Sequence, residues 1–113
     1  MESNRLVIVW LSVDKQAALD MAMLYARDSL LHGWWDAAEL ILWGPSVKAV
    51  DDSEPLQQEL ALMQHVGVRV SACLACAVRY GVTEHLTALG IEVRGMGEPL
   101  TEYLKSGAPV LFI

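Results

Sequence analysis

The chain has 113 residues, which suits one domain that buries about two-thirds of its unfolded surface on folding. Hydrophobic residues make up 54% of it and charged residues 19%, so either the core is unusually complete or some apolar surface is buried in an oligomer. A net charge of -6 without a Lys/Arg cluster argues against a surface for nucleic acid or for an anionic membrane.

The apolar run at residues 6–11 is far too short to span a bilayer, and it lacks the basic start and cleavage site of a signal peptide. We therefore expect a cytoplasmic protein without a membrane segment. Two cysteines three positions apart do not make the disulfide framework of a small secreted domain. Residues 1–113 are treated as one domain, because no linker, repeat or low-complexity segment divides them.

The first half of the chain predicts alternating strands and helices. The continuous apolar run at residues 6–11 is typical of a strand covered on both faces. A helix is expected over residues 14–31, with Gly33 placed to end it. A second strand over residues 38–43 is stopped by the turn at residues 44–46.

A second helix is expected to begin after capping residues at 51–53 and to end at Gly67. The remaining predicted elements follow in order: a strand over residues 68–73, one or two helical turns over 74–80, a short helix over 83–90, a strand over 91–94, a helix from 98 to 107 and a strand over 109–113. This alternation predicts an α/β fold with a central, mainly parallel five-stranded sheet covered on both faces.

The helix over residues 14–31 is apolar almost all round, which indicates burial on more than one side. In a domain of this size, the second side is expected to meet another subunit. Trp34 and Trp35 would extend that contact surface, since aromatic residues are enriched in interfaces. The alternative is an Ala-rich helix at an ordinary surface.

Loops that follow parallel strands gather at one edge of the sheet, where ligands usually bind. The residues expected to line a cleft at this edge are Ser12, Gly44, Pro45, Ser46, Gly95, Met96 and Gly97.

Cys73 falls at the same edge, between a strand and a helix. Free N–H groups and the helix dipole are expected there to favour the thiolate, which is the reactive form of cysteine. The alternative is a buried cysteine that acts as a small hydrophobe.

Cys76 follows at a spacing that suggests a dithiol, because residues three apart share a helix face. A thioredoxin-like enzyme carries its Cys-x-x-Cys in another context, so we favour a Cys76 that packs on the sheet.

No metal site is expected, since two cysteines cannot fill a tetrahedral site. No cofactor is expected either, because neither a Walker motif nor Gly-x-Gly-x-x-Gly is present.

Three segments carry a resemblance to a known family. They read LWGPS at residues 42–46, GVRVSACLACAVRYGV at 67–82 and MGEPLTEYL at 96–104. Together they resemble the DsrE/DsrF-like family, the small proteins of bacterial and archaeal sulfur relays. With the spacing between them, the resemblance covers essentially the whole chain.

The resemblance implies a three-layer α/β/α fold and assembly into trimers or hexamers. In the sulfur-relay members it also implies a cysteine that carries a persulfide, eight positions before the glycine that ends the short helix. Here these residues are Cys73 and Gly81. Cys76 is shared with a subgroup of small single-domain proteins and is absent from the relay subunits with the best-defined role.

The predicted function is that of a sulfur-relay protein, a sulfurtransferase-like carrier that accepts sulfane sulfur as a persulfide on Cys73 and transfers it. Its partners would be sulfur donor and acceptor proteins. Two alternatives stay open: a non-catalytic oligomeric module that binds a small ligand or a protein, and a dithiol redox protein that uses Cys76 as well.

Overall fold

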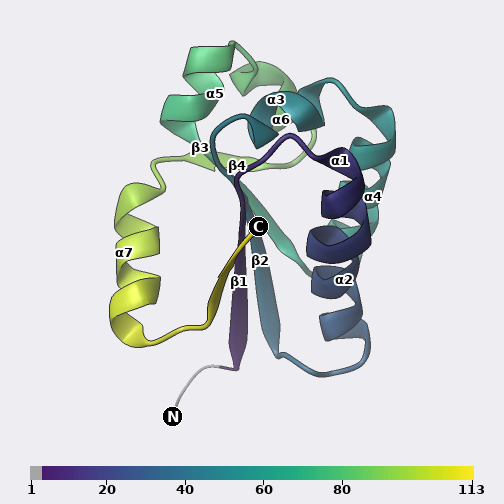
Figure 1. Cartoon of the computed structure of the whole chain (residues 1–113), viewed down its shortest axis with the longest axis vertical. Coiled ribbons are helices and arrows are strands. Elements are labelled where there is room, and N and C mark those ends of the chain that lie inside the picture. Colours follow the sequence, from purple (N-terminus) through teal and green to yellow (C-terminus); the bar gives the residue numbers. More distant parts are fainter. Residues whose placement is uncertain (1–3) are drawn as a thin grey trace.

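A computed structural model describes residues 4–113 of the chain. Its centre is a sheet of five parallel strands in the order β4-β3-β2-β1-β5 (Figure 1). The strands are β1 (Arg5–Trp10), β2 (Ala37–Leu42), β3 (Arg69–Cys73), β4 (Glu92–Arg94) and β5 (Val110–Phe112). The predicted fold class is confirmed, and every strand pair in this sheet is parallel.

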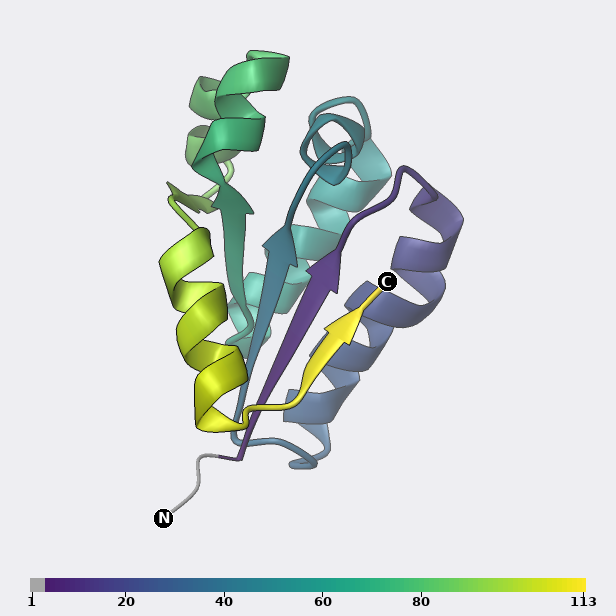
Figure 2. The same cartoon turned by 60° about the vertical axis from the view of Figure 1, so that its left-hand side comes forward.

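Helices cover both faces of the sheet and one of its ends (Figures 1 and 2). One face carries α1 (Lys15–Ala17), the π-helical segment η1 (Ala18–Met23), α2 (Leu24–Leu31) and α4 (Glu54–Val66). The opposite face carries α7 (Gly97–Ser106). Three short helices gather at the carboxyl ends of the strands: α3 (Ser46–Asp51), α5 (Leu74–Tyr80) and α6 (Thr83–Ala88).

The route of the chain explains the two faces. From β1 to β4 the chain crosses the sheet in one direction, and it then returns through α7 to place β5 beside β1. Parallel connections are right-handed, so reversing the direction of travel puts α7 on the face opposite α2 and α4. The beginning of α7 therefore lies near the carboxyl end of β4, on the side of the sheet that the other long helices leave open.

β1 shows how the sequence fits a sheet that is covered by helices on both faces. Leu6, Ile8 and Trp10 pack with the helices α2 and α4, whereas Val7 and Val9 pack on the α7 face. All five side chains are buried, as a continuous apolar strand with helices on both faces requires.

The helix expected over residues 14–31 is present, but its middle is π-helical. Asp14 caps its start, because the carboxylate accepts a hydrogen bond from the backbone N–H of Ala17 at 2.9 Å. The small side chains of Ala18, Ala22 and Ala26 are fully buried against the sheet. Leucine and methionine side chains on its outer side remain exposed, so burial of this side by another subunit stays a prediction.

The helix α3 was not predicted, because residues 44–46 and 51–53 read as a turn and as caps for a later helix. Ser46 explains its formation. The Ser46 hydroxyl accepts a hydrogen bond from the backbone N–H of Trp43 at 2.9 Å and lies 2.8 Å from the carbonyl oxygen of Trp10. It thereby joins the ends of β1 and β2, while Val47 and Val50 of α3 are buried.

The α7 face contains a buried polar cluster around Glu39, which is only 3% exposed. The Tyr103 hydroxyl donates to one carboxyl oxygen of Glu39, and the Ser71 hydroxyl donates to the other at 2.6 Å. Arg94 Nη2 lies 3.2 Å from the same oxygen as Ser71. A buried carboxyl without such partners is very costly, so these donors fasten α7 and β4 to the centre of the sheet.

Replacing Tyr103 by Phe should lower the free energy of unfolding by about 1–3 kcal/mol, because one oxygen of Glu39 then loses its donor in a buried site. Urea denaturation measures this change. Tyr80→Phe is the control, because Tyr80 lies exposed on α5 and should tolerate the change.

The wild type and Tyr103→Phe also differ in how their stability depends on pH. Burial, and then the hydrogen bond to Glu39, raise the pKa of Tyr103 above its ordinary value of 10.0. Because the pKa of Tyr103 is raised in the folded state, the stability that its protonated hydroxyl contributes is complete below pH 10 and is lost as the pH rises further. The wild type should therefore lose stability above pH 10 more steeply than Tyr103→Phe; parallel losses would contradict the cluster's role.

Candidate functional site

Cys73 is the last residue of β3 and the residue from which α5 begins. It is 7% exposed and shares a buried cluster with Ile41 of β2 and Met96, which precedes α7. The strand-to-helix junction predicted from the sequence is thus present. The thiol lies at the carboxyl edge of the sheet, beneath the beginning of α7.

The ionisation of Cys73 differs from the expectation. Burial raises the pKa of the Cys73 thiol above its ordinary value, and the neighbouring Cys76 side chain raises it further. The backbone N–H groups of Cys76 and Ala75 act in the opposite direction, but their effect is smaller. The sequence correctly predicts that a helix, with its free N–H groups, begins at Cys73. It does not reveal how completely Met96 and Ile41 exclude water from the sulfur.

Cys76 lies within the first turn of α5 and is partly buried. Its sulfur accepts a hydrogen bond from the backbone N–H of Gly44 at 3.2 Å, and its side chain also interacts with that of Cys73. Both cysteines are free thiols. Cys76 does pack against the core on both faces of the sheet, but its sulfur also joins Cys73 to the loop after β2.

The predicted edge residues fall into two groups. Gly44 and Met96 surround the thiols, and exposed Gly95 and Gly97 flank Met96. Gly44 has a φ of 71°, a left-handed conformation that directs its N–H to Cys76 and favours glycine.

The other edge residues lie on the far side of the Gly44 loop. Ser12 accepts a hydrogen bond from the Trp10 indole N–H at 2.9 Å. Ser46 is fully buried, so it supports the loop from within and is not open to a ligand. Pro45 lines a pocket beside α3.

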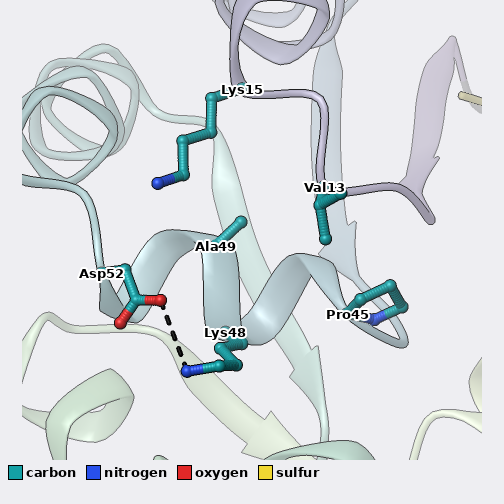
Figure 3. A pocket seen from close by; sticks show the side chains of 6 residues that line it. All are labelled: Val13, Lys15, Pro45, Lys48, Ala49 and Asp52. Atoms are coloured by element: carbon teal, nitrogen blue, oxygen red, sulfur yellow. Dashed lines mark hydrogen bonds and ion pairs between the residues drawn. The ribbon is translucent and has the colours of Figure 1, made fainter.

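That pocket has a volume of about 220 Å³ and is the hollow shown in Figure 3. Its lining residues are Val13, Lys15, Pro45, Lys48, Ala49 and Asp52. The Lys48 ammonium is paired with the Asp52 carboxylate at 3.4 Å, while Lys15 contributes a second ammonium group. The pocket lies at the same edge of the sheet as the thiols, but neither cysteine lines it.

Over residues 4–113, the structure brings together no group of three His, Cys, Asp or Glu side chains that could hold a metal ion. Within the same residues, the helices are too short or too polar to cross a membrane.

Sequence reasoning missed the cluster around Glu39. One signal was available: Glu39 interrupts a strand that is otherwise apolar and was expected to be covered on both faces. A charge in such a place requires partners. Those partners, Arg94 and Tyr103, are 55 and 64 positions away and could not be named without the fold.

Residues 14–112 match the model of the DsrE/DsrF-like family. The chain belongs to this family. The segments that carry the sequence resemblance include the loop of Gly44, the junction at Cys73 and the start of α7, which meet at the site described above. No curated protein matches the chain.

Solved structures of this DsrE/DsrF-like fold agree with the topology. A conserved protein of unknown function from Bacteroides thetaiotaomicron is 42% identical, with a TM-score of 0.95 over 97% of this chain and 95% of its own. A protein of unknown function from Methanobacterium thermoautotrophicum is 19% identical, with a TM-score of 0.78 over 98% of this chain and 100% of its own. The ychN protein of E. coli is 19% identical, with a TM-score of 0.70 over 99% of this chain and 100% of its own. The last two similarities show the fold alone.

The buried position of Cys73 predicts a slow thiol at neutral pH. In Cys76→Ala, where Cys73 is the one remaining cysteine, the rate of alkylation should rise with pH around a midpoint above that of an unperturbed thiol. The same variant unfolded in urea provides the control, since burial is then absent and the midpoint should return to the ordinary value. A folded midpoint below the unfolded one would show that the helix N–H groups outweigh burial.

Proposed function

We propose that this DsrE/DsrF-like protein accepts sulfane sulfur on Cys73 and passes it on as a persulfide. The observation that carries the proposal is the placement of the Cys73 thiol at the carboxyl end of β3, where α5 begins. The carboxyl edge of a parallel sheet is where such folds usually carry their ligands. A cytoplasmic location would suit this chemistry, because thiols stay reduced there.

Loading is a thiol exchange reaction. The Cys73 thiolate attacks the outer sulfur of a donor persulfide, so that a new S–S bond forms on Cys73 while the donor's S–S bond breaks and the donor leaves as a thiolate. The raised pKa of Cys73 makes the thiolate scarcer but a stronger nucleophile. Transfer to an acceptor repeats the reaction in the next protein, whose thiolate attacks the outer sulfur held by Cys73.

The backbone N–H groups matter most after loading. A persulfide is more acidic than a thiol, so the loaded group is an anion at neutral pH. The N–H groups of Ala75 and Cys76, which favour negative charge on Cys73, can then act on the persulfide anion. Met96 and Ile41 belong to the same buried apolar cluster as Cys73. The site would thus hold a charged sulfur chain within a mainly apolar wall.

The pocket beside α3 favours the second candidate function, a module that binds a small molecule. Val13, Pro45 and Ala49 supply apolar surface and Lys15 supplies an ammonium group, while Lys48 is paired with Asp52, a combination that suits a small, partly apolar molecule with an anionic group. Such a module needs neither cysteine. It is distinguished from a sulfur carrier by the fate of the thiols when a persulfide donor is added.

Assembly into a trimer or hexamer is part of the proposal. Met21, Leu24 and Leu31 leave apolar surface on the outer side of the first helix, as a buried interface requires. Light scattering at micromolar concentration should therefore give three or six times the mass of one chain. A single-chain mass across that range would rule out the assembly.

Incubation with a low-molecular-weight persulfide should add one sulfur to Cys76→Ser, because Cys73 remains as the acceptor. Cys73→Ser should gain none, since the thiol at the site of loading is gone. Intact-protein mass spectrometry reads both results. A sulfur adduct on Cys73→Ser but not on Cys76→Ser would reverse the roles of the two thiols, and no adduct on either variant would favour the binding module.

A further inference from the structure

The second thiol occupies a position that a simple sulfur carrier does not require. Cys73 is the N-cap residue of α5, and Cys76 lies three residues further on, within the first helical turn. The Cys76 side chain is close enough to the Cys73 thiol to help raise its pKa. Residues placed in this way come within the separation that a disulfide can bridge.

Gly44 fixes the sulfur of Cys76 from the other side. Its backbone N–H points to Cys76 Sγ at 3.2 Å, and its left-handed conformation is set by the loop that Ser46 secures to Trp10 and Trp43. Cys76 thus accepts a directed hydrogen bond in addition to its apolar packing. Here the thiol is held between a backbone donor and the sulfur that is proposed to carry the cargo.

We infer that Cys76 is a second reacting thiol that discharges the persulfide on Cys73, releasing hydrosulfide and leaving a disulfide between Cys73 and Cys76. This inference rests on the proposed function, since it needs a loaded Cys73. The protein would then have two outcomes for one cargo: transfer to an acceptor thiol, or release as hydrosulfide when no acceptor is bound.

The step balances without another oxidant. The Cys76 thiol passes its proton to the outer sulfur of the persulfide anion, and the resulting Cys76 thiolate attacks the inner sulfur, which is Cys73 Sγ. The bond between Sγ and the outer sulfur breaks, and its electron pair leaves with the outer sulfur as hydrosulfide. The sulfane sulfur is reduced by two electrons while the two cysteines are oxidised to a disulfide. A dithiol reductant then restores both thiols by exchange and itself becomes a disulfide.

The contacts also explain why the discharge would be controlled. Attack requires the Cys76 sulfur to leave the Gly44 N–H and approach Cys73 Sγ in line with the outer sulfur. Met96 and Ile41 confine the Cys73 side of this path. An acceptor protein instead attacks the outer sulfur, so the two outcomes use different sulfur atoms of the same persulfide.

The test is a single-turnover experiment with a low-molecular-weight persulfide as donor, followed by removal of excess donor. In the wild type we expect one hydrosulfide released per loaded chain and a mass that shows loss of two hydrogens from the dithiol protein. Cys76→Ser keeps an acceptor for the Gly44 N–H but cannot form the disulfide. Its sulfur adduct should persist about tenfold longer or more, because a tethered thiol acts at roughly millimolar effective concentration.

Leu74→Ala is the matched control, since it alters an exposed neighbour on α5 and leaves both thiols in place. It should discharge at the wild-type rate. Equal lifetimes of the adduct in the wild type and in Cys76→Ser, without a disulfide, would overturn this inference and leave the proposed function intact. Failure of Cys76→Ser to take up sulfur at all would instead overturn the proposed function.

Discussion

A buried carboxyl group on β2 determines how the α7 face is built. Glu39 cannot remain in the core without partners, and its partners come from β3, β4 and α7. Satisfying one side chain therefore fixes a helix and two strands that are distant in sequence. Since Met96 precedes α7, the same cluster fixes the residue that covers Cys73. The partners of Glu39 thus help to place the residue that packs beside the buried Cys73.

Burial then decides the chemistry available to Cys73. If Cys73 were exposed, the helix N–H groups would lower the pKa of its thiol and favour the reactive thiolate. Beside Met96 and Ile41 it is instead a buried thiol with a raised pKa. This state is compatible with the proposed uptake of sulfur from a donor persulfide. Under the proposed function, the N–H groups that lower the pKa of the thiol would also favour the charge of a persulfide.

Local signals in the sequence predicted the five strands, the main helices and the junction at Cys73. Apolar runs and the glycine after α4 were sufficient for this. The short helix α3 was missed because a buried Ser46, which pairs with Trp10 and Trp43, reads as an ordinary turn residue. The pKa of Cys73 and the partners of Glu39 depend on contacts between distant segments, and no local pattern encodes them.

The most direct test is to locate the sulfur in the wild-type protein. A sample loaded with a low-molecular-weight persulfide is quenched early with an alkylating agent, digested and sequenced by fragment ions that separate Cys73 from Cys76. The account predicts that the extra sulfur lies on Cys73 in the early samples and that peptides with a Cys73–Cys76 disulfide replace it later. Extra sulfur found first on Cys76 would contradict the account.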